Sequence, residues 1–326
     1  MKIVIPNYCT SDSFEENVSV TLRRMGHEVM NMGDISIHVE SSPFYRIAKE
    51  IKHKVFGLGT DQELWLSRIS KTFRPDLVLS LTQCLSEERL FEVRKQGIRA
   101  IAWWGDPAAN MIGKGLCHKE WDLIFIKDRY AAFKLQSLDL PAFQLYEAMN
   151  PLWHKPVATQ RNHRVVIAGN FYDYRHYLTT KLADKNVELE LYGARLPLWA
   201  DARIKKLHTG IYVTKENKSR VFGEAMAVLN STAMREFSSV NCRAFEIAGT
   251  GGLQIMEYRP SIEDCFEPDN EILLFKNMNE LYEILERARS APDEMKKIRT
   301  AAANRAVREH TYKHRLDVIL GKFNEL

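Results

Sequence analysis

The sequence predicts an α/β protein built on parallel sheets, and two observations support this prediction. Short apolar runs typical of buried strands alternate with amphipathic stretches of helical period over most of the chain. The length of 326 residues is also long for one hydrophobic core and indicates two domains. Two such sheets joined by a short linker would border an interdomain cleft with the carboxyl ends of their strands, where ligands of open parallel sheets bind.

In the first half, apolar runs predict strands at residues 2–5, 27–31, 76–81, 100–104, 122–127 and 142–146. Helical periodicity connects them at 14–25, 62–71, 87–96 and 129–137. The interval 36–59 contains Pro43, Gly57 and Gly59, which break a long helix, so we interpret it as an insertion or lid.

A break at Met149-Asn-Pro151 and a polar stretch to His163 predict a linker. Beyond it, strands are predicted at 164–168, 187–192, 225–229, 253–256 and 271–275, followed by helices at 279–289, 292–309 and 312–323. We interpret the basic run from Lys296 to Arg315 as a solvated helix face.

Composition narrows the class of protein. The apolar and charged fractions, 45% and 27%, are those of a globular protein, and a net charge of +4 is too small to argue for nucleic acid. This charge is compatible with an anionic small molecule or an acidic membrane surface. The chain starts on a predicted strand, and no apolar stretch approaches the ~18–20 residues of a membrane span. The five cysteines form no C-x-x-C pair, which argues against a disulfide framework or a zinc site. We therefore expect a cytoplasmic protein without a transmembrane segment, a disulfide framework or a zinc site.

The most informative stretch is residues 241–252, Asn-Cys-Arg-Ala-Phe-Glu-Ile-Ala-Gly-Thr-Gly-Gly. Asn241 predicts the N-cap of a short helix that stops at the glycines Gly249, Gly251 and Gly252. Arg243 lies in the first turn, where the helix dipole repels a cation by up to ~1 kcal/mol. An anion sharing the site would explain this cation, because backbone N–H groups and a guanidinium together suit a diphosphate.

Glu246 lies three residues after Arg243 and projects from the same side of the helix. Its carboxylate could accept hydrogen bonds from the two hydroxyls of a ribose, worth about 1.5–3 kcal/mol each. Alternatively, Arg243 and Glu246 pair on the helix surface, worth about 0.2–0.5 kcal/mol. The residues alone leave both interpretations open.

A second candidate loop begins at Gly169, between a predicted strand and helix, where a glycine lets a phosphate approach the backbone. Arg175 repeats the cation at a helix start, and two such cations at one sheet edge favour an anion site. Taken alone, Arg175 is better explained by a surface pair with Asp173. Tyr212 could stack on a base, although a core tyrosine is the more usual role.

In the first half, Trp103 and Trp104 end a strand at the same expected cleft and are followed by Asp106. The tryptophans could present flat faces to a sugar, and Asp106 could accept a proton from a hydroxyl nucleophile. A buried aromatic pair and an Asp-Pro turn explain the pattern better. Glu147 follows another strand and is a second carboxylate of this kind.

Absent motifs exclude several functions. The sequence contains no Asp-x-Asp for a metal-held diphosphate, no G-x-x-x-x-G-K-[ST] and no G-x-G-x-x-G, so P-loop hydrolysis and ordinary dinucleotide oxidoreduction lose support. It also lacks the G-x-S-x-G elbow of hydrolases and the H-E-x-x-H of zinc peptidases.

From Val165 to Arg315 the chain resembles the C-terminal half of the group-1-type glycosyltransferases called spore-maturation-protein-like, or CgeB-like. The matching pieces are Gly169-Asn170 with Arg175, Leu229-Asn230, Asn241 through Arg243-Ala-Phe-Glu246 to Gly252, Phe266 with Glu271-Ile272, and His310-Thr-Tyr-Lys-His-Arg315. The first half matches more loosely through Trp104-Gly-Asp-Pro107, Asp122-Leu-Ile-Phe125 and Glu147-Ala-Met-Asn-Pro151.

This resemblance implies the GT-B architecture, two facing Rossmann-like domains with an interdomain cleft. The expected domains are an acceptor-side domain at 1–155, a nucleotide-sugar domain at 156–310 and a final helix at 311–326 that crosses back to the first domain. Glu246 would bind the donor ribose, and Arg175 and Arg243 would face the diphosphate. The donor-binding set we expect from the matched motifs and loops is Gly169, Asn170, Arg175, Tyr212, Asn241, Arg243, Glu246 and Gly252.

The resemblance also implies a metal-independent glycosyltransferase that needs no cofactor. We expect a nucleoside-diphosphate sugar as the donor, a UDP-sugar above others, and a glycan, a protein or a small molecule as the acceptor. Retaining members of the wider group carry a second glutamate eight positions before the ribose-binding one, where this chain has Ser238, with Glu236 out of register. If the enzyme inverts, Asp106 is the expected catalytic base. Two alternatives remain, a nucleotide-sugar epimerase on the same fold and a non-catalytic sugar-nucleotide-binding or surface-assembly protein.

Overall fold

The structure is a computed structural model that describes residues 1–34, 60–158 and 160–326. The interval 36–59, for which the sequence suggested an insertion or lid, lies outside the described residues. The chain divides into two compact units: an N-terminal unit of Met1–Glu147 with Tyr312–Leu326, and a C-terminal unit of Ala148–Thr311. Among the helices of the described ranges, none combines the length and the apolar character needed to cross a membrane.

The N-terminal unit is built on a parallel sheet, which has six strands within the described residues. They are β1 (Lys2–Ile5), β2 (Glu28–Asn31), β3 (Leu77–Leu81), β4 (Arg99–Trp104), β5 (Leu123–Ile126) and β6 (Ala142–Gln144). Their order across the sheet is β2-β1-β3-β4-β5-β6, and every pairing is parallel. Strand order therefore reverses between β1 and β3.

Polar caps start the helices of this unit. These helices are α1 (Phe14–Arg24), α4 (Asp61–Phe73), α5 (Glu87–Arg94), α6 (Arg129–Gln136) and α13 (Tyr312–Asn324), with the short turn η1 (Ala108–Asn110). The N-caps of the first four are Ser13, Thr60, Ser86 and Asp128, each of which accepts a backbone N–H with its side chain.

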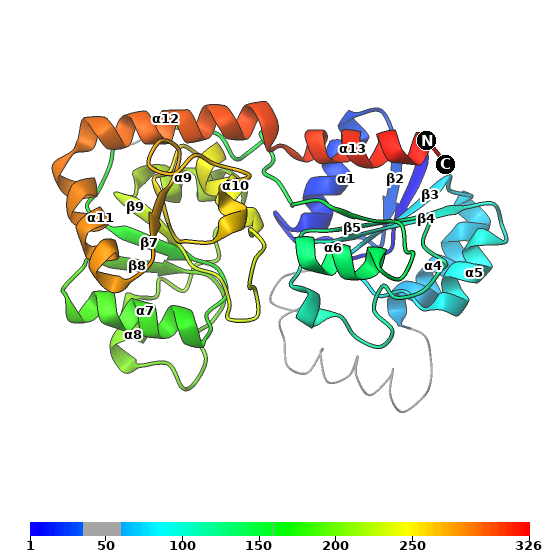
Figure 1. The fold of residues 1–326 in the computed structure, drawn as a ribbon, viewed down its shortest axis with the longest axis horizontal. Coiled ribbons are helices and arrows are strands. Elements are labelled where there is room, and N and C mark those ends of the chain that lie inside the picture. Colours follow the sequence, from blue (N-terminus) through cyan, green and yellow to red (C-terminus); the bar gives the residue numbers. More distant parts are fainter. Residues whose placement is uncertain (35–59, 159) are drawn as a thin grey trace. The chain divides into compact units, whose positions relative to one another are not determined.

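The alternation of side chains along β4 separates the helices onto two faces of the sheet. Trp104 joins a core formed with α4, α5 and α6. Trp103 points the other way and packs edge-on against Phe14 of α1, with ring centroids 4.8 Å apart, and against Tyr312 of α13, at 6.2 Å. Figure 1 shows α13 beside α1.

The C-terminal unit holds a parallel sheet with five strands among residues 148–158 and 160–311. They are β7 (Val165–Ala168), β8 (Leu189–Tyr192), β9 (Ala227–Asn230), β10 (Gln254–Glu257) and β11 (Leu273–Phe275). The order is β11-β10-β9-β7-β8, again with every pairing parallel. Strand order reverses between β7 and β9, and ligands of open parallel sheets bind at such a reversal.

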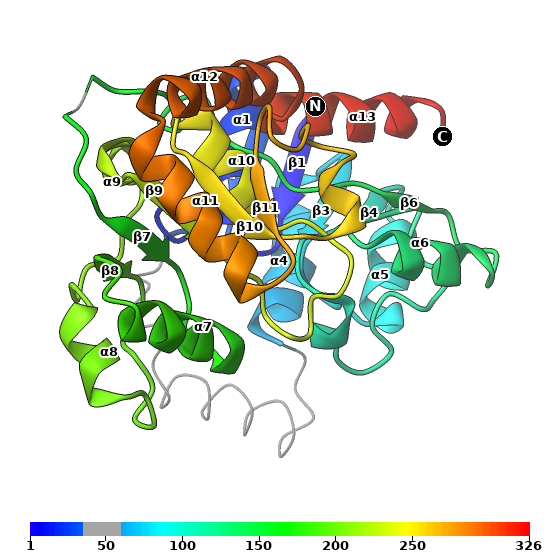
Figure 2. The same cartoon turned by 60° about the vertical axis from the view of Figure 1, so that its left-hand side comes forward.

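The helices of this unit also cover both faces of their sheet. They are α7 (Asp173–Asp184), α8 (Ala202–Leu207), α9 (Lys215–Glu224), α10 (Cys242–Gly249), α11 (Met278–Ser290) and α12 (Pro292–Glu309), with the turn η2 (Pro260–Ile262). One core is formed with α7, α8, α11 and the start of α12, and a second with α9 and α10. Figure 2 shows α12 running beside α10, with which it is in contact.

The predicted parallel α/β fold is therefore confirmed, and each predicted strand is present to within about two residues at either end. One detail of the sequence interpretation was wrong. Arg299, in the basic run expected to face solvent, is buried and donates through Nη2 to the carbonyl of Met226. Burial lowers the pKa of its guanidinium to about 10.

Two glycines fix the distance between the ends of β7 and β8. A Cβ on Gly193, which follows β8 with φ +142°, would lie 2.2 Å from the carbonyl oxygen of Gly169. We predict that Gly193→Ala lowers the free energy of unfolding by about 2–4 kcal/mol, because the methyl group collides with backbone and φ is unfavourable. Urea unfolding measures the change.

Gly210 gives a matched control, since it also has positive φ (+75°) but no atom lies within 4 Å of an added Cβ. Gly210→Ala should cost only about 1 kcal/mol, the backbone part of the penalty. Equal losses in the two variants would contradict the close approach of Gly193 to Gly169.

Candidate functional site

Polar side chains gather where strand order reverses in the C-terminal sheet. Gly169 follows β7, Ser231 follows β9, and Arg175 in the first turn of α7 joins the two segments. Arg175 donates through Nε to the hydroxyl oxygen of Ser231 at 2.9 Å, and through Nη2 to the Ser231 carbonyl. The guanidinium therefore holds together the two loops that border the reversal.

Protein groups accept from all five N–H positions of Arg175. Besides Ser231, its acceptors are the carbonyls of Ala168 and Asn170 and the Tyr172 hydroxyl. The residue is only 5% exposed. The surface pair with Asp173 that the residue alone suggested was wrong, because these buried acceptors draw the guanidinium under the loop.

Arg243 brings a second guanidinium to the same glycine. A Cβ added to Gly169 would lie 3.3 Å from Nη1 of Arg175 and 3.3 Å from Nη2 of Arg243. Burial lowers the pKa of Arg175, and the positive charge of Arg243 lowers it further. Gly169 thus lies between two positively charged guanidiniums. Their mutual repulsion is unfavourable, and an anion bound beside them would reduce it.

Glu246 connects Arg243 to a third cation. Its Oε2 lies 3.2 Å from Nε of Arg243, and its Oε1 lies 2.9 Å from Nζ of Lys218 on α9. The side chains of Glu246 and Lys218 are each only 5% exposed. Arg243 and Glu246 do pair, as one interpretation held, but the expectation of a surface pair was wrong because α10 is buried beyond its first turn. We call Gly169, Arg175, Lys218, Arg243 and Glu246 the Gly169 cluster.

Asn241 organises the start of α10. Its Oδ1 accepts from the backbone N–H of Ala244 at 3.2 Å, which confirms the predicted N-cap. Its amide also exchanges two hydrogen bonds of 3.0 Å with the amide of Asn230, the last residue of β9. These contacts fix the direction of the helix, and so the place of Arg243 at its first turn.

The other expected donor-site residues fall in different places. Tyr212 is half-buried near the cluster: burial raises the pKa of its phenol, and the positive charges of Arg243 and Lys218 oppose that rise. Asn170 is exposed at the end of β7. Gly252 lies beyond the other end of α10, about 12 Å of helix away from the first turn, against Phe222 and Ile247. The structure does not bring it to the Gly169 cluster.

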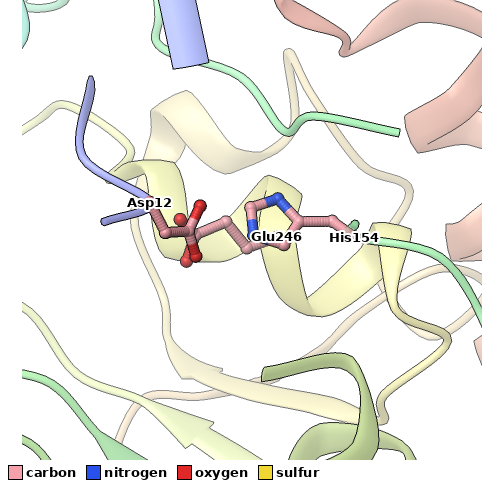
Figure 3. A group of neighbouring side chains, drawn as sticks. All are labelled: Asp12, His154 and Glu246. Carbon is pink, nitrogen blue, oxygen red and sulfur yellow. The ribbon is translucent and has the colours of Figure 1, made fainter. Parts of the chain in front are cut away.

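A buried histidine completes the surroundings of Glu246. His154, in the segment between Asn150 and Lys155, is 0% exposed. One of its ring nitrogens lies within 4.8 Å of a carboxylate oxygen of Glu246, and Figure 3 shows the His154 ring beside the Glu246 side chain. Its Nδ1 accepts the backbone N–H of Asn150 at 3.2 Å.

In the N-terminal unit, the carboxyl end of β4 presents one exposed carboxylate. Asp106 accepts a hydrogen bond from Asn110 Nδ2 at 3.1 Å. Trp103 and Trp104 are both buried, on opposite faces of the sheet, so they are core residues and offer no face to a sugar. Glu147 is also buried, and its Cδ would lie 2.9 Å from a Cβ on Gly105.

Sequence reasoning missed Lys218, Ser231 and His154. Lys218 had a readable signal, because Val221 and Phe222 follow it by three and four residues and place it on the buried side of α9. Ser231 and His154 follow a strand and a proline turn without any periodic pattern, and only tertiary packing reveals them.

The Lys218–Glu246 pair generates a stability prediction. Lys218→Met should lower the free energy of unfolding by about 3 kcal/mol, the low end for a broken buried pair because Arg243 still neutralises Glu246. Urea unfolding measures the loss. Arg220→Met on the same helix is the control, since the exposed Arg220–Glu224 pair at 3.6 Å should contribute under about 0.5 kcal/mol. A loss for Lys218→Met no larger than that of the control would sink the prediction.

Solved structures similar to this chain share its two-sheet GT-B fold. Sucrose-phosphate synthase from Thermosynechococcus elongatus is 12% identical with a TM-score of 0.69, covering 100% of this chain and 98% of its own. Anabaena HepE in complex with UDP-glucose is 11% identical with a TM-score of 0.68, covering both chains completely. A glycosyltransferase from Rickettsia africae is 10% identical with a TM-score of 0.66, covering 99% of this chain and 98% of its own.

No curated protein matches the sequence. A family model described as glycosyl transferase-like matches residues 151–321, more than half of the chain and all of the Gly169 cluster. The chain therefore belongs to the glycosyl transferase-like family.

Proposed function

We propose that this protein transfers a sugar from a nucleoside-diphosphate sugar to an acceptor. The observation that carries the proposal is the charge of the Gly169 cluster. Arg175 and Arg243 both approach the backbone of Gly169, and Arg243 shares the buried carboxylate of Glu246 with Lys218. Two guanidiniums beside a glycine at the reversal of a parallel sheet favour an anionic ligand such as a diphosphate.

The cluster fits the charge that develops during sugar transfer. When the bond between the sugar and the diphosphate breaks, negative charge grows on the leaving diphosphate, and fixed cations stabilise that state more than the ground state. Arg243 is the guanidinium we assign to this role, because its side chain is 20% exposed. Arg175, whose donors are engaged, would act through its charge and by holding the loop at Gly169.

We assign the donor ribose to Glu246 and the base of the nucleotide to the surroundings of Tyr212. The UDP-glucose bound by HepE, which has the same fold, supports a UDP-sugar as the donor. The motifs from Gly169 to His310 support the CgeB-like subgroup. The cytoplasmic location expected from the sequence stays a prediction.

We assign acceptor binding to the N-terminal unit. The exposed carboxylate of Asp106 would take the proton of the acceptor hydroxyl as that oxygen bonds to the anomeric carbon. Ser238 stands where a second glutamate was expected, and the nearby Glu236 accepts a hydrogen bond from the Ser239 hydroxyl at 3.0 Å. This arrangement favours a base in the N-terminal unit.

The direct test measures nucleotide binding and turnover. UDP at 100 times its dissociation constant should stabilise the protein by ~2.7 kcal/mol, which a thermal-shift screen of nucleoside diphosphates and their sugars detects. Arg243→Ala should lose this stabilisation and about 100-fold in kcat/KM, the usual loss for one charge-stabilising donor. Arg203→Ala is the control, because Arg203 is exposed and pairs with Asp184.

Normal UDP binding and turnover in Arg243→Ala would contradict the assignment of the diphosphate. Incubating the enzyme with a UDP-sugar alone separates the two alternatives. An epimerase would change the sugar without an acceptor, and a non-catalytic binding protein would bind UDP and turn nothing over.

We also propose that transfer needs no metal ion, because the Gly169 cluster already supplies fixed positive charge to a diphosphate. Turnover should therefore be unchanged by EDTA and should not rise when Mg²⁺ or Mn²⁺ is added back. An assay of released UDP checks this. Loss of activity in EDTA with recovery on adding Mg²⁺ would overturn the metal-independent mechanism and leave sugar transfer itself standing.

A further inference from the structure

The segment that carries His154 is a rigid turn organised by Asn150. The backbone carbonyl of Asn150 accepts the N–H groups of Trp153 and His154, at 3.3 and 2.8 Å, and its Oδ1 accepts the N–H of Leu152 at 3.1 Å. Pro151 fixes φ at the second position of this turn. The donated N–H of Asn150 then closes the loop on His154 Nδ1. We call residues 150–155 the Asn150 turn.

The Asn150 turn is attached to α9 and α10, two of the three helices that carry residues of the Gly169 cluster. Ser219, next to Lys218 on α9, donates its hydroxyl to the Trp153 carbonyl at 2.6 Å and accepts the N–H of Lys155 at 3.2 Å. On α10, a Cβ on Gly249 would lie 3.1 Å from the carbonyl oxygen of His154, so the turn packs directly on that helix. The turn therefore fixes α9 relative to α10, and with them the two ends of the Lys218–Glu246 pair.

The hydrogen bond from Asn150 also fixes the tautomer of His154. A ring nitrogen that accepts an N–H carries no proton, so the neutral imidazole holds its proton on Nε2. Nε2–H is then the donor that the ring can offer to the carboxylate of Glu246, which lies within 4.8 Å of the ring. Lys218 approaches the same carboxylate at Oε1 and Arg243 at Oε2.

We propose that His154 is a positioning residue that holds the Glu246 carboxylate in the orientation needed to bind the ribose hydroxyls of the donor nucleotide. The inference rests on the proposed function and extends it to a residue outside the matched motifs. Lys218 and Arg243 each hold one oxygen of the Glu246 carboxylate, and a directional N–H from a buried ring adds a third restraint on its rotation. His154 thereby contributes to the discrimination between a ribonucleotide and a deoxyribonucleotide.

Two conservative substitutions divide the functions of the ring. In His154→Asn, the amide oxygen takes the place of Nδ1 and keeps the bond from Asn150, but the Nε2–H donor is lost. In His154→Gln, the amide nitrogen takes the place of Nε2 and keeps that donor, while the bond from Asn150 is lost. If His154 has only a structural role in the turn, His154→Asn should preserve ribose recognition and His154→Gln should impair it. If His154 positions Glu246, His154→Asn should impair ribose recognition and His154→Gln should preserve it.

The readout is the dissociation constant of each analogue, 2′-deoxy-UDP and 3′-deoxy-UDP, divided by the dissociation constant of UDP. The larger of these two ratios measures ribose recognition. Charged hydrogen bonds to the ribose should make UDP bind at least about tenfold more tightly than one of the two analogues in the wild-type protein. We expect this ratio to fall below about threefold in His154→Asn and to persist in His154→Gln. His208→Asn is the matched control with an unchanged ratio, because His208 Nδ1 also accepts a backbone N–H, from Gly210 at 3.0 Å.

The outcomes separate the inference from the function beneath it. If the wild-type protein discriminates and His154→Asn keeps the full ratio, the positioning role is wrong and the proposed function stands. If the wild-type protein binds UDP and both analogues equally, Glu246 is not the ribose ligand and the inference falls with that assignment. If no nucleoside diphosphate binds, both the proposed function and the role of His154 are overturned.

Discussion

The concentration of positive charge beside one glycine is the constraint on which the C-terminal unit depends. Like charges placed together in a poorly solvated site repel, so each cation of the Gly169 cluster needs its own compensation. Carbonyl and hydroxyl oxygens surround Arg175, and the carboxylate of Glu246 faces Lys218 on one side and Arg243 on the other. Since two cations share the carboxylate of Glu246 and two guanidiniums meet at Gly169, an anionic ligand would reduce the repulsion between them.

The backbone around the cluster follows from the need to bring charges to that point. Gly169 has no side chain to separate the two guanidiniums, and Gly193 lets the end of β8 approach its carbonyl. The reversal between β7 and β9 opens a gap between two loops, and Arg175 fills it while bonding to Ser231. The sheet order and the two glycines therefore leave room between the two loops, and the hydrogen bonds of Arg175 hold those loops in place.

Local sequence patterns predicted the fold, because strands buried on both faces leave short apolar runs that few other structures produce. They also predicted the cap at Asn241 and the cation at Arg243, since helix starts have their own chemistry. They did not reveal how Arg175 is used, because its acceptors include Ser231, far along the chain. The approach of His154 to within 4.8 Å of Glu246 likewise depends on packing of the Asn150 turn on α9 and α10, which no local periodicity encodes.

Under the proposed function, the shared carboxylate would also link diphosphate binding to ribose binding. A diphosphate paired with Arg243 would weaken the interaction of that guanidinium with Glu246 Oε2, and the oxygen would become available to a ribose hydroxyl. Lys218 keeps the other oxygen in place at 2.9 Å, so the carboxylate stays in the site instead of following the arginine. In the proposed complex, binding of the diphosphate would therefore favour binding of the ribose, and the reverse. A nucleoside, which lacks the diphosphate, would find both oxygens of Glu246 still paired with Lys218 and Arg243.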